Sequence, residues 1–497
     1  MQKHTLSLLL FLLFISCKDN KQVISLQTGL LISHVNILSS EDGNYEAYEG
    51  YVLLEQDKIM YVGKEKPEIK GEFEELDGTG KYLIPGLIDS HVHVTEVQGM
   101  NFDQQAKHTA PAEQFRKQVP RSYLYHGFTS LINLGGISED QLEFFAAQPL
   151  SPEIYHTGRS GVSVPNGYPM NFVPEQFRFE AAPNFVFLES EADKIPEKFN
   201  PEDHSPKAVV KRIKESGAIA VKTYYESGFR NLGTLPLPTE EIITQLQQEA
   251  DANDLVLSVH GNSYEAHKFL TDIGVDIITH GMWNWGDYKD VPSDSLPPEI
   301  KEVLDKQIEQ QIGYTATLTV LEGEKVLTDP NFLHKAELAK VVPAQMIDWY
   351  KSEEGQWFGK DIFGDMPPEM VDRIYGNIQA HALLVLKYLA EHGGLILYGT
   401  DTPSAPTYGN PPGLNGYWEL ELMAKAGMSL EQILASATIH NAKAFHLENE
   451  IGSIAKGKRA NLVLLSSNPL ESIEAYAAID HIILNGELIE RESLSAK

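Results

Sequence analysis

Histidine, lysine and aspartate side chains stand at the ends of several apolar runs in this chain. The first pair is His91-Val92-His93, near the end of the run Leu83–Val94. On a β-strand, residues two apart point to the same side, so both imidazoles would face one way. Such a pair can begin a metal site. It also suits two partly buried histidines that bond to the backbone, and further ligands would decide between the two.

Four further polar residues close, or nearly close, later apolar runs. They are Lys222, His260, His280 and Asp401. Imidazole nitrogens and a carboxylate form a donor set that suits zinc or a related divalent ion. The only cysteine is Cys17, so the body of the chain offers no thiolate ligand, cysteine nucleophile or internal disulfide.

Lys222 directly follows the apolar run Ala218–Val221. An ammonium at this point would lie beside bound cations, which is unfavourable. The amine could be neutral, or it could react with carbon dioxide to give an anionic carbamate that bridges two metals. The other interpretation is an ion pair with a carboxylate such as Glu226, and the residue alone favours that ion pair.

The central part of the chain alternates strands and helices, which predicts an α/β fold. The predicted strands end near His93, Leu134, Thr157, Tyr225, His260, His280, Val320 and Gly399. About eight strand–helix units predict a (β/α)8 TIM barrel rather than an open doubly wound sheet, and no G-x-G-x-x-G phosphate turn occurs. Polar residues at the carboxyl ends of barrel strands converge on one active site.

Short strands flank this region on both sides. We predict a barrel over residues 85–449 and a small β-sandwich built from residues 25–84 and 450–497. Residues 161–203 lack a regular period and predict a long loop, and residues 321–372 predict a partly helical cover.

Two local signals mark the last elements of the chain. Ser429–His446 is predicted to be a helix that begins with a capping box of Ser429 and Gln432. Asn485-Gly486 is a strong hairpin turn signal.

The first residues have the proportions of a bacterial signal peptide, predicted over residues 1–16. The apolar run Leu6–Ile15 is too short to span a membrane as a mature helix. Phe14-Ile15-Ser16-Cys17 resembles a lipoprotein lipobox, which implies cleavage before Cys17, lipidation of Cys17 and a tether over residues 17–24. We therefore expect export and lipid anchoring to the cell envelope, in the periplasm or outer membrane. The alternative is a secretory signal with an incidental cysteine.

Composition agrees with a globular protein and argues against one class of partner. The 497 residues are 42% hydrophobic and 22% charged. The formal net charge of −30 argues against nucleic-acid binding. These features are compatible with an oligomer.

The order H-x-H, K, H, H, D on successive strands resembles the amidohydrolase superfamily over about residues 81–470. The matching segments are KYLIPGLIDSHVH, GFTSLINLGG, THG, GTD and ATIHNAKAF. The segment Ile451–Leu470 is similar to the imidazolonepropionase-like branch, although this chain has Asn461 where that branch has Asp.

The resemblance implies a role for each polar residue. His91, His93 and Asp401 would hold the more buried metal, carboxylated Lys222 would bridge two Zn²⁺ ions, and His260 and His280 would hold the second. Asp401 would also be the catalytic proton shuttle. The implied enzyme hydrolyses an amide of a small molecule, such as a dipeptide or an N-acyl amino acid, with a metal-activated hydroxide.

Substrate-contacting candidates lie at or just past strand ends: His156, Arg159, Tyr224 and Tyr225. Each could equally be structural, and Arg159 best suits an anionic substrate end. One alternative function is a mononuclear cyclic-amide hydrolase or deaminase of the imidazolonepropionase type, against which Lys222 argues. Another is a non-catalytic surface binding lipoprotein, against which the six filled ligand positions argue.

Overall fold

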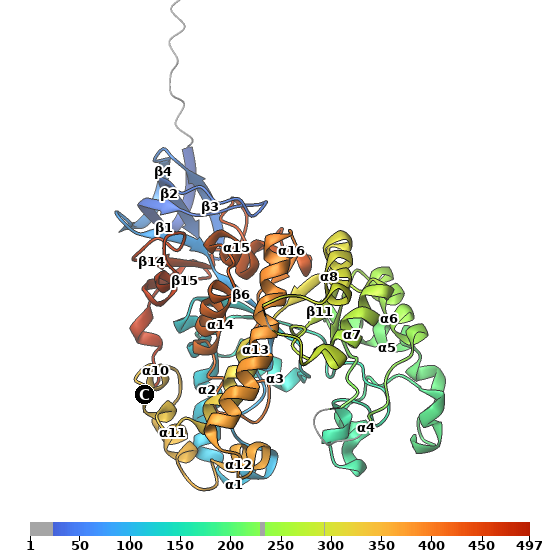
Figure 1. The fold of residues 1–497 in the computed structure, drawn as a ribbon. Coiled ribbons are helices and arrows are strands. Elements are labelled where there is room, and N and C mark those ends of the chain that lie inside the picture. Colours follow the sequence, from blue (N-terminus) through green and yellow to red (C-terminus); the bar gives the residue numbers. More distant parts are fainter. Residues whose placement is uncertain (1–22, 229–233, 293) are drawn as a thin grey trace, which may run out of the picture.

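The computed structural model describes residues 23–228, 234–292 and 294–497. The predicted signal peptide and Cys17 lie outside the described residues. Figure 1 shows one large sheet at one end of the molecule and helices around parallel strands in the rest of it. The described chain is therefore an α/β protein.

The parallel strands form two sheets, of three and five strands. The first sheet has the order β6 (Leu87–Val92), β7 (Phe128–Asn133) and β8 (Glu153–His156). The second runs from β9 (Ala220–Tyr224) through β10 (Val256–His260), β11 (Ile277–Thr279) and β12 (Gly313–Thr315) to β13 (Ile396–Leu397). Seven of these eight strands end within two residues of the predicted positions, and β12 ends earlier than predicted.

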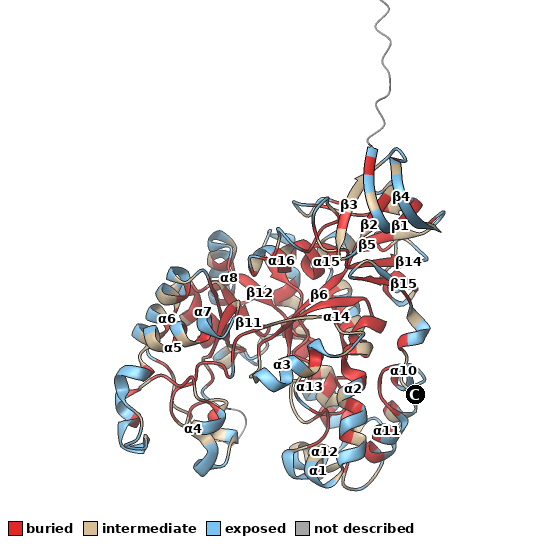
Figure 2. Cartoon of the chain, turned by 180° about the vertical axis from the view of Figure 1, so that it is seen from behind, coloured by how far each residue is buried: buried red, intermediate tan, exposed pale blue. Residues whose placement is uncertain are grey.

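The two parallel sheets meet at both edges. Isolated parallel bridges pair Val92 of β6 with Thr402 and pair Val162 with Thr223 of β9. One core cluster draws a side chain from each of six strands: Ile88, Ile132, Ala220, Val256, Ile277 and Leu397. The central strands are accordingly buried in Figure 2. Both sheets thus share one inner face.

Helices follow most of these strands. Before the last strand they are α1 (Phe102–Lys107), α2 (Thr109–Tyr125), α3 (Glu139–Ala146), α5 (Pro206–Glu215), α6 (Glu240–Ala252), α7 (Tyr264–Ile273), α8 (Pro298–Gln310) and α13 (Pro368–Glu391). Ser205, Thr239 and Ser263 cap α5, α6 and α7 by accepting a backbone N–H with their side chains. α6 buries Ile243 and Leu246, as its helical spacing predicts.

The predicted strand ending near Val320 is corrected. β12 ends at Thr315, and Thr319–Lys325 forms α9. The buried Glu419 of α14 (Leu414–Lys425) accepts the backbone N–H groups of Leu318 and Thr319 at 2.9 and 2.8 Å. This distant carboxylate satisfies donors at the start of the helix, where helices leave N–H groups unpaired.

Before α13 begins at Pro368, the two irregular segments contain only short helical pieces. The first has η1 (Met170–Phe172), η2 (Glu175–Phe177), α4 (Arg178–Ala181), η3 (Glu189–Lys194) and η4 (Pro201–His204). The second has α9, η6 (Val326–Thr328), η7 (Phe332–His334), α10 (Leu338–Val341), α11 (Ala344–Tyr350) and α12 (Trp357–Phe363). A further 3₁₀ turn, η5, spans Gly286–Tyr288. The long loop and the partly helical segment are therefore confirmed.

Segments from both flanks of the parallel region form the large sheet. Its order is β16-β15-β14-β5-β1-β2-β3, and β4 pairs with β1. The strands are β1 (Val23–Ile37), β2 (Tyr48–Glu55), β3 (Lys58–Gly63), β4 (Glu68–Asp77), β5 (Tyr82–Pro85), β14 (Leu462–Leu465), β15 (Ile479–Leu484) and β16 (Glu487–Glu490). β1 begins at Val23, so residues 23 and 24 of the predicted tether lie in a strand. Asn485 and Gly486 have positive φ and connect β15 to β16 as a tight hairpin.

The predicted helix Ser429–His446 has three parts. They are α15 (Leu430–Ala435), a π-helical turn η8 (Ser436–His440) and α16 (Asn441–Ala444), followed later by the 3₁₀ turns η9 (Ile473–Ala477) and η10 (Arg491–Leu494). The capping box of Ser429 and Gln432 is present.

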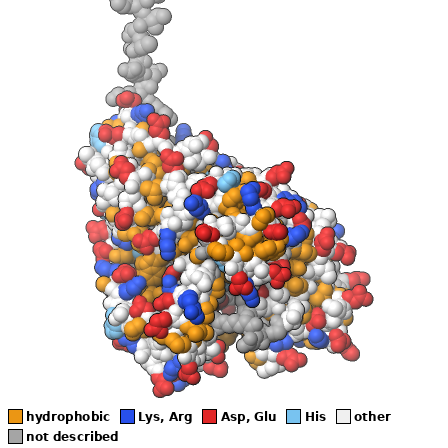
Figure 3. Space-filling model, in the orientation of Figure 1, with side chains coloured by type: hydrophobic (Ala, Val, Ile, Leu, Met, Phe, Trp, Pro, Cys, Tyr) orange, Lys and Arg blue, Asp and Glu red, His pale blue; other side chains and the backbone are white. Residues whose placement is uncertain are grey.

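The surface and the helices bear on possible partners. Among the described residues, no helix combines the length and the apolar character needed to cross a bilayer. On the face in Figure 3, basic side chains lie scattered among acidic ones and form no continuous basic patch.

Candidate active site

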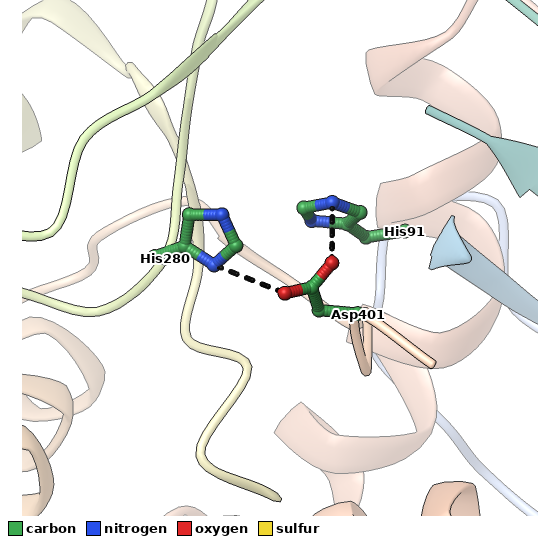
Figure 4. Close-up of side chains that lie close together, drawn as sticks. All are labelled: His91, His280 and Asp401. Atoms are coloured by element: carbon green, nitrogen blue, oxygen red, sulfur yellow. Dashed lines mark ion pairs between the residues drawn. The ribbon is translucent and has the colours of Figure 1, made fainter. Parts of the chain in front are cut away.

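His91, His280 and Asp401 meet at the carboxyl end of the parallel strands (Figure 4). One ligand atom from each lies within 4.8 Å of the others. His91 Nε2 is 3.0 Å from Asp401 Oδ1, and His280 Nδ1 is 3.9 Å from Asp401 Oδ2. The first residue is in β6, and the other two follow β11 and β13, so the fold brings together residues from three distant parts of the chain.

The remaining predicted histidines lie beside this group. His93 Nε2 is 2.8 Å from Asp401 Oδ1. The ring centroid of His260 is 4.3 Å from that of His280. The structure therefore places four imidazoles and one carboxylate together, as the sequence predicts.

Lys222 reaches the same place from β9. Its side chain is buried, hydrogen-bonds Thr279 Oγ1, and lies with Nζ 5.8 Å from the centroid of the Tyr224 ring. Burial lowers the pKa of the Lys222 amine to about 7, although the charge of Asp401 acts in the opposite direction. Lys222 follows Ala220 by two residues, so both side chains face the shared inner core.

Glu226 does not pair with Lys222, contrary to the simpler interpretation of that lysine. Glu226 Oε2 lies 3.3 Å from His260 Nε2 and accepts a hydrogen bond from Asn262 Nδ2 at 3.0 Å. Asn262 gives no signal in the sequence beyond its position two residues after His260.

Burial keeps most of these imidazoles neutral. It lowers the pKa of His91 to about 3 and holds the pKa of His280 well below its usual value. Burial alone would raise the pKa of Asp401, but contacts with His91 and His280 hold it well below its usual range. Neutral imidazoles and an ionised carboxylate are the forms that bind metal ions.

The backbone around the site is held in uncommon conformations. His280, Thr317 and Asp401 have φ values of 80°, 46° and 56°. Non-glycine residues rarely adopt positive φ, and such strain concentrates at functional sites. Thr317 Oγ1 lies 3.0 Å from His280 Nδ1, so the loop after β12 fixes the orientation of this ring.

A buried carboxylate joins the strands that carry His91 and Asp401. Asp89 accepts hydrogen bonds from the backbone N–H of His91 at 3.2 Å and from the N–H and hydroxyl of Thr400 at 3.1 and 2.7 Å. Burial raises the pKa of Asp89 to about 7. Sequence reasoning missed this residue, although an acidic residue inside an apolar strand is a usable signal.

The tyrosine candidates for substrate contact divide between two faces of the sheet. The Tyr224 ring lies 6.2 Å from His260 and 5.4 Å from the ring of Tyr168, so it borders the site. Tyr225 stacks on Phe269 of α7 at 4.3 Å, in the helix layer. Tyr168 comes from the segment 161–203 and was not predicted.

Among the described residues, neither His156 nor Arg159 makes a side-chain contact with the proposed metal ligands. Tyr155 packs against the inner core, so the side chain of its neighbour His156 points to the opposite face of the strand. His156 Nδ1 accepts a hydrogen bond from the backbone N–H of Gly158 at 3.1 Å. Arg159 is exposed. Among the described residues, Tyr224 is the one of the four predicted substrate residues that contacts a histidine or the lysine of the site.

Comparison with known proteins decides the family. Residues 82–489 match the model of the amidohydrolase family. This chain belongs to the amidohydrolase family. The amidohydrolase is 23% identical to the imidazolonepropionase of Thermoanaerobacter pseudethanolicus in an alignment of length 459 that covers 88% of each protein. It is a hydrolase of a family that acts on carbon–nitrogen bonds.

Two solved structures show the same fold. An Xaa-Pro dipeptidase with bound methionine is 20% identical with a TM-score of 0.61, covering 93% of the amidohydrolase and all of that chain (100%). A putative prolidase from Bifidobacterium longum is 21% identical with a TM-score of 0.62, covering 93% and 94% of the two chains.

The amidohydrolase family is metal-dependent, and the residues present fit a metal. The donor set is imidazole and carboxylate, which suits zinc. His91 Nδ1 is buried and has no hydrogen-bond partner among the described residues. A buried polar atom without a partner is costly unless it has a function.

Proposed function

We propose that this amidohydrolase hydrolyses an amide bond in a small molecule of the dipeptide or N-acyl amino acid class. Two Zn²⁺ ions would be held by His91, His93, Lys222, His260, His280 and Asp401. The observation that carries the proposal is the meeting of four imidazoles, Asp401 and a buried lysine at one end of the parallel strands. The dipeptidase and prolidase structures support the substrate class.

We propose that the parallel strands close into a (β/α)8 barrel over residues 85–449, beside a β-sandwich of residues 25–84 and 450–497. Two bridges at the sheet edges and the inner cluster shared by six strands support closure. A closed barrel explains why residues so far apart in sequence share one end.

Asp401 is proposed to move the proton. When bound, the metal ions would lower the pKa of water and polarise the substrate carbonyl. Asp401 is ionised and fixed between His91 and His93, so it can accept a proton from the attacking water and donate it to the leaving nitrogen. Tyr224 borders the same space and is proposed to contact the substrate.

Lys222 is proposed to carry a carbamate. It is 1% exposed and pairs with no carboxylate among the described residues, whereas a buried ammonium normally requires one. A carbamate would convert this position into an anionic, bidentate ligand.

A second candidate is a one-metal enzyme that opens a cyclic amide or deaminates a ring. Only His91, His280 and Asp401 form a compact three-ligand group among the described residues, and His260 contacts Glu226. The imidazolonepropionase relative supports this candidate.

Metal content and turnover together test the proposal. Zinc-reconstituted protein would be assayed on dipeptides, N-acyl amino acids and cyclic amides, and its zinc measured. We expect two zincs per chain. Lys222→Ala should lower both zinc content and turnover, the latter at least about 100-fold.

Lys268→Ala is the matched control, because Lys268 is exposed and pairs with Asp272. One zinc per chain with an active Lys222→Ala variant would establish the one-metal candidate. Protein that binds ligands without turning over any amide, ester or lactone would instead be a binding protein.

We also propose that the protein is exported and anchored through Cys17 to the cell envelope. The signal-peptide pattern of residues 1–16 supports this proposal.

A further inference from the structure

Glu226 and Asn262 form a polar pair beside His260 that the proposed reaction does not use. Glu226 follows β9 and Asn262 follows β10, so both stand at the carboxyl end of the strands. Glu226 Oε2 accepts a hydrogen bond from Asn262 Nδ2 at 3.0 Å, and Oε1 accepts the backbone N–H of Gly228 at 2.8 Å. Glu226 is 7% exposed and Asn262 5%, so the carboxylate is buried and fixed in orientation.

No lysine or arginine among the described residues forms an ion pair with Glu226; its contacts are a backbone amide, a side-chain amide and the imidazole of His260. The nearest lysine in sequence, Lys222, bonds Thr279 instead. A buried carboxylate without a cation is costly, so a ligand that brings a positive charge would be stabilised beside it. A carboxylate offers about four acceptor positions, and the three contacts leave one for a ligand.

An aromatic ring borders the same space. The ring of Tyr168 lies 4.7 Å from that of His260 and 5.4 Å from that of Tyr224. Aromatic faces attract ammonium groups, especially where water is excluded. The carboxylate of Glu226, the side-chain amide of Asn262 and the rings of Tyr168 and Tyr224 therefore lie close together. Such groups can accept hydrogen bonds from a protonated amine and attract its positive charge.

We propose that Glu226 and Asn262 bind the positively charged amino group of the substrate. The substrate is then a dipeptide with a free amino terminus, and not an N-acyl amino acid. The α-amino nitrogen of such a dipeptide lies two bonds from the scissile carbonyl carbon, which agrees with the contact between Glu226 and a predicted metal ligand, His260. This inference rests on the proposed function, because it defines the substrate class of the same site.

Binding of two matched probes tests the inference, and chromatography after each titration shows whether either probe has been hydrolysed. Zinc-loaded protein would be titrated calorimetrically at neutral pH with L-leucinamide, which carries an ammonium group, and with N-acetyl-L-leucinamide, which does not. The wild type should bind leucinamide at least about 10-fold more tightly. Glu226→Gln preserves shape and an acceptor oxygen. It should abolish this preference and leave the affinity for the acetylated probe within about threefold.

Glu265→Gln is the control for general charge, because Glu265 is exposed on α7 and lies three residues after Asn262 in the sequence. It should keep the preference. Zinc content and the unfolding midpoint of each variant would be measured alongside.

Equal affinity of the wild type for the two probes, or no measurable leucinamide binding, would overturn the inference. So would a Glu226→Gln variant that loses zinc and both probes together, since Glu226 would then only orient His260. Hydrolysis of dipeptides and their N-acetyl forms is assayed separately. Tighter binding of leucinamide without hydrolysis of any dipeptide would refute the proposed function but not the role of Glu226 and Asn262. Hydrolysis of dipeptides without tighter binding of leucinamide would support the proposed function and refute that role.

Discussion

Asp401 touches three of the four histidines in the site, at 3.0 Å from His91, 2.8 Å from His93 and 3.9 Å from His280. The position of Asp401 also depends on a backbone hydrogen bond that involves no metal-binding atom. Its backbone N–H donates to the carbonyl of His91 at 2.7 Å, which ties the segment after β13 to β6. The site is therefore held by backbone contacts as well as by side chains.

The hydroxyl of Thr317 should matter for metal binding. Thr317→Val keeps the β-branched shape and removes the contact with His280 Nδ1 at 3.0 Å. Because such contacts orient a ligating histidine, we expect zinc affinity to fall about 10- to 100-fold, measured by competition with a chelating dye. Thr328→Val removes a hydroxyl that, among the described residues, donates to the carbonyl of Lys325 far from the site, and should leave zinc affinity unchanged. Equal affinities in the wild type and Thr317→Val would refute this role.

Glu419 should make stability depend on pH. Burial raises its pKa from 4.5 to about 7, so the folded state favours the protonated form. Its contribution is fully present below pH 4.5 and is lost as the pH rises through 7, by up to about 3 kcal/mol. Glu419→Gln should therefore flatten the fall in unfolding free energy over this interval, measured by urea denaturation.

The exposed Glu302 on α8 offers the control for Glu419. Glu302→Gln should reproduce the wild-type slope. A Glu419→Gln protein with that same slope would show that Glu419 does not titrate in this interval.

At the scale of elements, α14 packs against the strands through a glycine. A Cβ on Gly416 would lie 2.5 Å from the ring of Phe128 and 2.8 Å from the hydroxyl of Tyr398. We expect Gly416→Ala to destabilise the protein by about 1–3 kcal/mol, because the helix would have to move from the sheet. The free energy of unfolding in urea measures this change.

Gly376 in α13 provides the matched helix glycine, since a Cβ there would meet nothing within 4 Å. Gly376→Ala should be neutral or stabilise by up to about 1 kcal/mol. Destabilisation of both variants by the same amount would exclude close packing as the cause.

Elements whose signals are local could be predicted from the sequence. The eight parallel strands are apolar runs, and α7 has both its cap and its periodicity within Ser263–Ile273. The start of α9 could not be predicted, because its N–H groups are satisfied by Glu419, which is 100 residues away from Thr319. Strand β4 was also missed, since its residues are mostly exposed and lack an apolar alternation.

The site shows the same division between local and distant information. The metal-ligand candidates could be predicted because each ends an apolar strand. Tyr168 and Glu226 could not, because the first lies in the irregular segment 161–203 and the second meets His260 only through folding.

At the scale of the whole molecule, the large sheet lies at one end (Figure 1). Its strand β5 leads directly into the amino end of β6, whereas the candidate site lies at the carboxyl ends of the parallel strands. β1 begins at Val23, six residues after Cys17 in the sequence. If Cys17 carries lipid, the short stretch between Cys17 and β1 would keep the large sheet close to the membrane.

Membrane attachment should depend on Cys17. Several acyl chains on one residue would anchor the protein stably. Cys17→Ser should therefore move the protein from the membrane fraction to the supernatant and abolish labelling by a radioactive fatty acid. A control is Ser25→Ala, in β1 beyond the tether. Membrane association of unlabelled Cys17→Ser protein would refute lipid anchoring through this residue.

A ribosome synthesises β1 to β5 first and β14 to β16 last. β5 pairs with β1 on one side and with β14 on the other, so one edge of β5 stays unpaired until the whole intervening region has been made. Pairing between such distant segments is slow. Until β14 has been made, that edge of β5 presents unpaired backbone N–H and C=O groups with which another strand could pair.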